Sequence, residues 1–304
     1  MTATAPQTTR TSSGIAKANA KLNLTLDVLG ERPDGFHEIR SLVIGLDLCD
    51  RIRCSPADER GVSLTCTSPG IKREDNLAYR AAVKLAKRLG VKAAVQIAIE
   101  KSIPIAAGLG GGSADAAATL MLCHRLWGNK LDDRELADLG AEIGSDVPLF
   151  FALPAAVITG RGERVNSVTM RWAGWVLLVF PGIACPTAEV YAAWKATDVA
   201  GLPTGMEERI VQATSADELS GIISNHLTRA VYRVAPEIER IHTALRRAGL
   251  GSMHITGTGS TLFQLFDKRE AACRAADKIE EAQLGVSTAV VAAPVGTRSD
   301  LNEE

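Results

Sequence analysis

The sequence predicts an α+β fold, in two domains or one large one. Strand-like and helix-like segments are mixed along its 304 residues, without the strict alternation that is typical of a parallel α/β sheet. Hydrophobic residues make up 46% of the chain, which allows a substantial core. No run reaches the roughly 18 apolar residues of a membrane span, so we expect no membrane partner.

The first periodic segment, residues 17–28, alternates polar and apolar side chains and predicts a half-buried strand. Lys21 and Asn23 lie two positions apart, so they project from the same side of that strand. Phosphoryl transfer needs positive charge against developing negative charge, and donors that hold the acceptor. The pair fits that need, although a strand lysine is also explained as a solvated surface residue.

A turn sequence at residues 32–35, Arg-Pro-Asp-Gly, follows this strand. Phe36 and His37 come directly after it. A side chain that can stack, next to one that can hydrogen-bond, indicates a corner that binds a flat ring. The alternative is a phenylalanine in the core and a histidine at the surface.

The remaining elements follow from periodicity and from start and stop signals. Asp75-Asn76 is expected to cap a helix that runs to about Leu89 and that Gly90 ends, and Pro236 fits the first turn of a helix that Gly249 ends. Other helices are expected at 114–126, 132–143, 187–196, 216–224 and 268–283. Strands are expected at 42–54, 62–67, 94–100, 155–159, 175–180, 253–256, 261–266 and 286–292.

The strongest chemical pattern is the segment 104–113, Pro-Ile-Ala-Ala-Gly-Leu-Gly-Gly-Gly-Ser, which precedes an alanine-rich helix. Glycines let backbone N–H groups approach an anion closely, and the helix N-terminus adds its dipole. A merely flexible loop would not need this helix. Ser113 is expected to cap it, with a hydroxyl that can reach a phosphate or Mg²⁺. The predicted nucleotide-binding residues are Pro104, Ala107, Gly108, Leu109, Gly110, Gly111, Gly112 and Ser113.

This loop differs from two common phosphate-binding motifs. It has no Gly-Lys-Ser/Thr, so it is not a Walker A loop. Counted from Gly108, the third glycine of a dinucleotide-binding fingerprint is replaced by Ser113, which disfavours a dehydrogenase.

Asp146 stands between a helix stop at Gly144 and Pro148, so its backbone is constrained. A carboxylate held in this way can take the proton from an attacking hydroxyl. Taken alone, it is more simply a cap or turn residue. The sequence Gly-Thr-Gly-Ser at 257–260 lies between two predicted strands and by itself predicts a simple hairpin.

Charge and cysteine usage exclude several classes of function. The 34 Lys and Arg residues nearly balance the 35 Asp and Glu residues, which gives no reason to expect nucleic-acid binding. The six cysteines form no C-x-x-C pair and the histidines are scattered, so we expect reduced thiols in a cytoplasmic protein without a protein-held metal. Residues 1–13 and 297–304 are expected to be loose tails, and the former lacks the apolar core of a signal peptide.

Three motifs in this order resemble the GHMP kinase superfamily: Ala-Lys-Leu-Asn-Leu at 20–24, the segment 104–118 and the turn at 257–260. Within the superfamily, the chain is similar to members whose acceptor carries cytidine diphosphate. The resemblance covers roughly residues 15–293. The pieces that narrow it are Arg32-Pro33-Asp34-Gly35-Phe36-His37-Glu38, Asp75-Asn76-Leu77, Gly144-Ser145-Asp146-Val147-Pro148, Gly160-Arg161-Gly162-Glu163 and Pro186-Thr187.

The resemblance implies a two-domain GHMP-kinase-like fold, with the active site in the cleft between an N-terminal domain at 14–168 and a C-terminal domain at 169–296. It implies transfer of the γ-phosphate of ATP to the 2-hydroxyl of the cytidyl diphosphate of methylerythritol, a step of the non-mevalonate isoprenoid route. Mg²⁺ would arrive with ATP. We expect a monomer or a weak homodimer.

The resemblance also implies a role for each site residue. Asp146 is the base, Lys21 supports it and the transferred phosphoryl group, and Asn23 helps to hold the substrate. Stacking on a base contributes about 1–3 kcal/mol, which suits an aromatic sandwich around the cytosine. The residues of this cytosine site are Phe36, His37, Thr187 and Tyr191.

The chain departs from the family at two places. The family usually has tyrosine where this chain has Phe36, which keeps stacking without a hydroxyl. It often has Asn-Asp-Leu-Glu where residues 225–228 are Asn-His-Leu-Thr, so we assign no acidic role there. The alternatives are a kinase for homoserine, mevalonate or a sugar, which has no cytosine to bind, and a nucleotide-binding protein without catalysis, which needs neither Lys21 nor Asp146.

Overall fold

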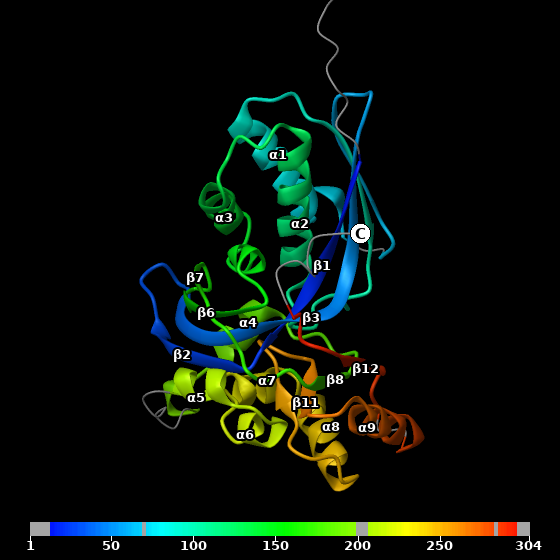
Figure 1. Ribbon diagram of the computed structural model, residues 1–304. Coiled ribbons are helices and arrows are strands. Elements are labelled where there is room, and N and C mark those ends of the chain that lie inside the picture. Colours follow the sequence, from blue (N-terminus) through cyan, green and yellow to red (C-terminus); the bar gives the residue numbers. More distant parts are fainter. Residues whose placement is uncertain (1–12, 69–70, 199–205, 283–284, 297–304) are drawn as a thin grey trace, which may run out of the picture.

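The computed structural model describes residues 13–68, 71–198, 206–282 and 285–296, and contains an eight-stranded sheet and a four-stranded sheet, both packed with helices (Figure 1). This architecture confirms the predicted α+β class. The larger sheet contains β1 (Gly14–Asn23), β2 (Thr25–Glu31), β3 (His37–Pro56), β4 (Gly61–Cys66), β5 (Ala94–Glu100), β6 (Ala155–Gly160), β7 (Arg164–Ser167) and β9 (Ser224–Asn225). The smaller sheet contains β8 (Trp175–Phe180), β10 (His254–Ile255), β11 (Leu262–Phe266) and β12 (Thr288–Ala292).

Strand β3 organises the larger sheet, because it is 20 residues long and pairs antiparallel with four other strands. Its first part pairs with β2 and β6, and its second part with β1 and β5. It begins at His37, earlier than the predicted start at residue 42, so His37 belongs to the sheet. The short strand β9 pairs parallel with β2, so the second half of the chain contributes to the first sheet.

Helices α1 (Leu77–Leu89) and α2 (Gly111–Leu126) pack on the larger sheet, and α3 (Asp133–Ala141) packs against α2 (Figure 1). The predicted signals of α1 are confirmed. Asn76 accepts a hydrogen bond from Ala78 N at 2.9 Å, and Gly90 ends the helix with a φ of 65°. Helix α3 ends at Ala141, short of the predicted residue 143.

The smaller sheet is antiparallel, in the order β10-β11-β8-β12. The helix predicted at 216–224 ends at Ser220, and Ser224 already belongs to β9. Pro236 opens α8 as predicted, whereas α5 and α7 were not predicted. The helices of this half are α4 (Thr187–Ala193), α5 (Met206–Gln212), α6 (Ala216–Ser220), α7 (Thr228–Val234), α8 (Pro236–Arg247) and α9 (Arg269–Ala282). Short 3-10 helices occur at η1 (Arg73–Asp75), η2 (Val147–Phe151) and η3 (Ala196–Asp198).

The strand predicted at 17–28 is two strands, because the chain bends at Leu24 between β1 and β2. The prediction that it is half-buried is also wrong, since both of its faces are covered. On its apolar face, Ala20, Leu22 and Leu24 belong to a hydrophobic cluster that extends to Phe263 of the smaller sheet. Its polar face is covered from the other side: Lys21 N donates to Leu109 O at 2.9 Å, and Asn23 N donates to Thr256 Oγ1 at 2.9 Å.

No helix among the described residues is long and apolar enough to cross a membrane. The tails expected at 1–13 and 297–304 lie outside the described residues, except for Ser13. The domain division at residue 168 stays a prediction.

Candidate active site

One cavity of about 960 Å³ lies where the glycine-rich loop, the β2–β3 turn and helix α4 meet. Its lining comes from both halves of the chain. Every site residue predicted from the sequence lines this one cavity: Lys21, Asn23, Phe36, His37, Pro104, Ala107, Gly108, Leu109, Gly110, Gly111, Gly112, Ser113, Asp146, Thr187 and Tyr191.

The glycine-rich loop turns sharply into α2. Gly108 and Gly110 have φ of 79° and 70°, in the left-handed region that favours glycine. Helix α2 begins at Gly111 with Gly110 as its N-cap, so the prediction that Ser113 caps the helix is wrong. The left-handed Gly110 starts the helix earlier and leaves Ser113 in its first turn. The unpaired N–H groups of that turn come mainly from glycines, which leave space for a phosphate.

The loop packs against the turn at 256–260. A Cβ on Gly108 would lie 2.7 Å from Gly259 O, so the two backbones are in direct contact. Thr261 Oγ1 donates to Ala107 O at 2.7 Å and holds the loop from the same side. The predicted simple hairpin is therefore a wall of the cavity, which Gly257 also lines.

Lys21 is buried, with 6% of its surface exposed, and its Nζ donates to Asn23 Oδ1. Both side chains project from the same side of β1, as predicted. Asn23 Nδ2 donates in turn to Ser41 Oγ at 2.7 Å. Burial lowers the pKa of Lys21, and the negative charge of Asp146 opposes this shift. The alternative of a solvated strand lysine is excluded.

Asp146 precedes η2, and Pro148 in the first turn of that helix constrains it as predicted. Its side chain makes no capping hydrogen bond, which excludes the interpretation as a simple cap. Gly162 lies against it: a Cβ there would be 3.3 Å from Asp146 Oδ1. The carboxylate lines the same cavity as Lys21 and Tyr191, and its negative charge opposes the lowered pKa of Lys21 and adds to the raised pKa of Tyr191.

The aromatic end of the cavity contains Phe36 from the β2–β3 turn, His37 from the start of β3 and Tyr191 from α4. The rings of His37 and Tyr191 have centroids 5.0 Å apart. Phe36 is 46% exposed, which excludes the alternative of a core phenylalanine. Thr187 Oγ1 lies 3.3 Å from Thr258 Oγ1, so this end also contacts the 256–260 turn. Burial raises the pKa of Tyr191, and the charge of Asp146 adds to this shift.

A buried charge cluster beneath the loop was missed by sequence reasoning. Lys101 Nζ donates to Asp50 and, at 2.8 Å, to Asp115 Oδ2. Asp50 Oδ1 also accepts from Ser102 N at 2.6 Å and Ile103 N at 2.8 Å, which fixes the chain entering the loop. Burial raises the pKa of Asp115 to about 7. Only the position of Lys101 just before the loop hinted at this cluster.

Asn225 was also missed. Its Nδ2 donates to Ile255 O at 2.9 Å and to Gly257 O at 2.8 Å, so it fixes the turn against which the loop packs. It lies in the segment where the sequence departs from the family. The structure gives this segment a positional role that does not need an acidic side chain.

Comparisons with known proteins agree with this architecture. The model of the GHMP kinases N terminal domain matches residues 76–153, and that of the GHMP kinases C terminal domain matches residues 210–283. A homoserine kinase from Cytophaga hutchinsonii has the same fold, with a TM-score of 0.71 at 16% identity over 99% of this chain and 98% of its own. The fold and the glycine loop are thus those of a GHMP kinase.

Proteins with a higher sequence identity to this chain identify its family within the GHMP kinases. The 4-diphosphocytidyl-2-C-methyl-D-erythritol kinase of Geobacter sp. (strain M21) is 39% identical, over 90% of this chain and 96% of its own. That of Symbiobacterium thermophilum is 38% identical, over 86% and 94%. A crystal structure of 4-(cytidine 5'-diphospho)-2C-methyl-D-erythritol kinase has a TM-score of 0.78 at 32% identity, over 93% of this chain and all of its own. The chain belongs to the 4-diphosphocytidyl-2-C-methyl-D-erythritol kinase family.

Proposed function

We propose that this chain transfers the γ-phosphate of ATP to the 2-hydroxyl of 4-diphosphocytidyl-2-C-methyl-D-erythritol, on the non-mevalonate route to isoprenoid precursors. One observation carries the proposal: a continuous series of neighbours crosses the cavity. Gly110 packs on Lys21, Asp146 lines the cavity together with Lys21 and Tyr191 and its charge affects the pKa of both, and Tyr191 contacts His37. Phosphate-binding, proton-accepting and ring-binding groups therefore follow one another in the order that the reaction needs.

The nucleotide occupies the end of the cavity at the glycine loop. The backbone N–H groups at the start of α2 bind the triphosphate, aided by the helix dipole. Ile71 and Ile105 line the cavity and are 44% and 50% exposed. Exposed aliphatic side chains at the rim suit the flat adenine. The bound ring would cover these side chains and remove their apolar surface from water.

Mg²⁺ would enter with ATP and be shared between its phosphates and the protein. Mg²⁺ prefers oxygen ligands and usually binds through one or two protein groups plus substrate phosphates. Ser113 and Asp115 both line the cavity beside the loop, and Asp115 Oδ1 has no hydrogen-bond partner. These oxygens fit the ion, which would offset the negative charge of the phosphates.

The acceptor hydroxyl would lie between Asp146 and the γ-phosphate. Asp146 accepts its proton as the oxygen attacks phosphorus. Lys21 stabilises the negative charge that develops on the transferred group, and burial strengthens this interaction because little water screens it. Asn23 is oriented by its hydrogen bond to Ser41 and presents a polar group to the substrate.

The test of the proposal is ADP release, measured by a coupled assay with three acceptors. We expect turnover of 4-diphosphocytidyl-2-C-methyl-D-erythritol and none of mevalonate or homoserine. Turnover of only one of the latter would refute the substrate, and release of ADP with none of them would refute the kinase assignment.

The alkaline limb of the pH–rate profile should report on Lys21. The protonated amine is the active form, so kcat falls as pH rises through its pKa, which burial places below the ordinary value of 10.5. Arginine stays charged throughout this range. We expect the Lys21→Arg variant to lose this limb, whatever its maximal rate. The profile is measured at saturating ATP, with circular dichroism as a control for unfolding, and an unchanged limb would assign it to another group.

His37→Ala should act on the acceptor rather than on ATP. His37 stacks near Tyr191 at the aromatic end, away from the glycine loop. Loss of one hydrogen bond and of this packing should raise the KM for the cytidyl acceptor about five- to tenfold. The KM for ATP of the same variant is the internal control and should change less than about twofold. Equal increases in both constants would contradict a cytosine-binding role.

A further inference from the structure

The turn Gly160-Arg161-Gly162-Glu163 has no role in the mechanism above, yet it lies against two parts of the site. Arg161 lines the cavity, and its guanidinium carbon lies 4.9 Å from the centre of the Phe36 ring. Gly162 lies against Asp146, as described above. The turn thus connects the side chain at the aromatic end with the proposed base.

The turn itself is rigid. Glu163 Oε2 accepts a hydrogen bond from Arg161 N at 2.7 Å, and Gly162 N donates to Thr159 O at 3.1 Å. Gly160 has a φ of 74°, and a Cβ there would lie 2.5 Å from Glu163 Oε1. The Glu163 carboxylate therefore folds back over a position that only glycine fits. Arg161 is presented from a fixed backbone.

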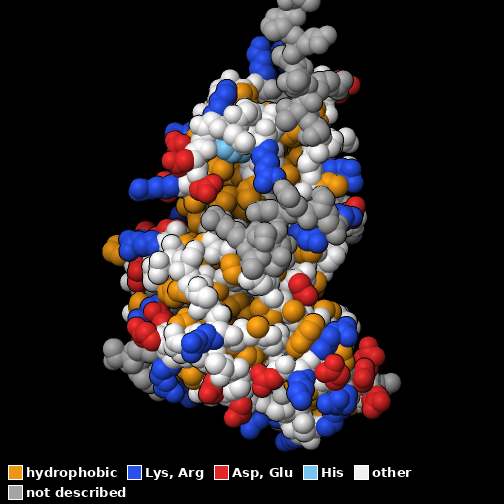
Figure 2. Space-filling view, viewed as in Figure 1, with side chains coloured by type: hydrophobic (Ala, Val, Ile, Leu, Met, Phe, Trp, Pro, Cys, Tyr) orange, Lys and Arg blue, Asp and Glu red, His pale blue; other side chains and the backbone are white. Residues whose placement is uncertain are grey.

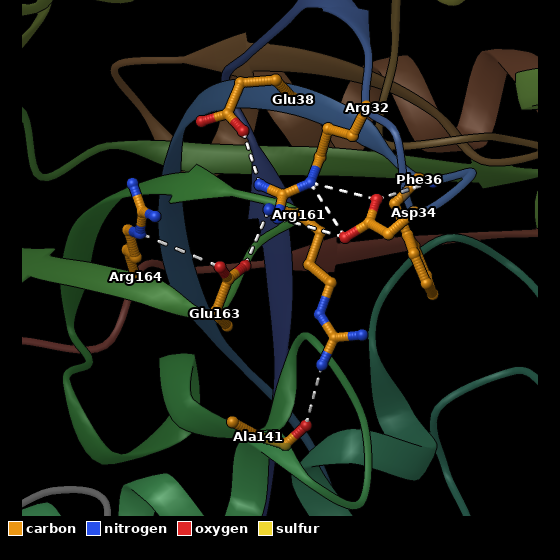
Figure 3. A network of polar contacts seen from close by, with 8 residues as sticks. All are labelled: Arg32, Asp34, Phe36, Glu38, Ala141, Arg161, Glu163 and Arg164. Carbon is orange, nitrogen blue, oxygen red and sulfur yellow. Dashed lines mark hydrogen bonds and ion pairs between the residues drawn. The ribbon is translucent and has the colours of Figure 1, made fainter.

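The opposite partner, Phe36, has a fixed backbone but an exposed ring. Arg32 Nη1 donates to Glu38 Oε2 at 2.6 Å, and Arg32 Nε donates to Asp34 Oδ1 at 3.2 Å. Asp34 Oδ1 also accepts from Phe36 N at 3.2 Å, so this network holds the main chain of the β2–β3 turn (Figure 3). The ring is 46% exposed, so its position depends on what lies over it.

The Arg161 guanidinium is suited to fixing the position of the Phe36 ring. Within the described residues its side chain forms no ion pair, and its hydrogen bond from Nη2 to Ala141 O is long, at 3.4 Å. A guanidinium over an aromatic face is attracted to the ring quadrupole. It lies over one face of the Phe36 ring, so a flat base would stack on the opposite face.

We propose that Arg161 is a positioning residue that holds Phe36 for stacking on the cytosine and thereby sets specificity for the cytidyl acceptor. This inference rests on the proposed function. A cation–π contact of this kind corresponds to about a three- to thirtyfold change in binding. We expect the effect on the acceptor rather than on ATP, because Phe36 belongs to the proposed cytosine site and not to the glycine loop.

The first test is Arg161→Gln, which keeps a polar side chain and removes the cation. We expect the KM for the acceptor and the Ki of cytidine as a competitive inhibitor to rise at least threefold, with the KM for ATP unchanged. Arg164→Gln is the matched control, since Arg164 directly follows this turn as the first residue of β7, is 69% exposed and does not line the cavity. That variant should behave as the wild type.

The second test separates action through Phe36 from direct contact with the substrate. In the Phe36→Leu background, Arg161→Gln should add less than about twofold to the Ki of cytidine, because the ring it positions is gone. Cytidine carries no phosphate. If Arg161 instead bound the diphosphate, the Ki of cytidine diphosphate would rise while that of cytidine stayed the same, and the effects of the two substitutions would multiply; this result overturns the inference.

A third measurement does not depend on the reaction. Fluorophenylalanine labelling gives one ¹⁹F resonance for Phe36, identified by its absence in Phe36→Leu. In the free protein, Arg161→Gln should shift this resonance and Arg164→Gln should not. An unshifted resonance overturns the contact. A shifted resonance in a protein that does not turn over the cytidyl acceptor would refute the proposed function and leave the contact established.

Discussion

The Asp146→Asn variant is expected to retain its fold and its affinity for ATP while kcat falls by about 10²–10⁴-fold. Asparagine matches the carboxylate in shape but cannot accept the proton of the attacking hydroxyl. The fold should be preserved because the Asp146 side chain makes no capping hydrogen bond. The measurements are kcat by coupled ADP release, and the Kd for ATP by calorimetry.

Asp138→Asn is the control for this experiment, since Asp138 is exposed on α3 and does not line the cavity. It should have wild-type kcat. Because Asp146 also attracts the Lys21 ammonium, its neutralisation should lower the pKa of Lys21 further and move the alkaline limb of the remaining activity to lower pH. A near-wild-type kcat for Asp146→Asn would remove Asp146 from the mechanism.

Gly108→Ala is expected to impair both folding stability and nucleotide binding. Its Cβ would lie 2.7 Å from Gly259 O and 2.9 Å from Thr256 O, and a φ of 79° is strained for alanine. Strain of this kind costs about 1–3 kcal/mol in the free energy of unfolding. The loop can avoid the contact only by moving away from the 256–260 turn, which displaces the phosphate-binding N–H groups. We expect at least a tenfold rise in the KM for ATP and a lower Tm.

Gly112→Ala is the matched control, from the same loop. The nearest atom to its added Cβ is Leu77 Cδ1 at 3.7 Å, an ordinary contact, and it lies in the first turn of α2, where alanine is favoured over glycine. Its Tm should equal or exceed that of the wild type. If Gly108→Ala had the same Tm as Gly112→Ala, the close packing of loop and turn would not be needed for stability.

Local signals in the sequence predicted the individual elements well. The cap at Asn76, the stop at Gly90 and the proline in the first turn of α8 act within a few residues, so they can be recognised from the sequence alone. Errors arose where distant parts of the chain decide the outcome. The start of α2 moved because Gly110 is left-handed in contact with Lys21, and residues 216–224 divided because Ser224 pairs with β2.

In the candidate site, too, local features could be predicted from the sequence, and contacts between distant residues could not. Residue types and spacing alone singled out the glycine loop, and the neighbours Lys21 and Asn23 on one strand. The family resemblance supplied the roles of Thr187 and Tyr191, which have no local pattern of their own. The buried Lys101 cluster, the support of the turn by Asn225 and the contact of Arg161 with Phe36 escaped prediction, because each joins residues far apart in the chain.

The sequence by itself therefore determined the α+β class, the glycine-rich loop that precedes a helix, and the family. Glycine, proline, capping residues and alternation act locally, so they can be read one segment at a time. Only the tertiary structure decided that β1 is buried on both faces, that the 256–260 turn supports the loop, and that proton-accepting and ring-binding groups share one cavity. Those properties depend on which distant segments of the chain come into contact, and the packing of the whole chain decides these contacts.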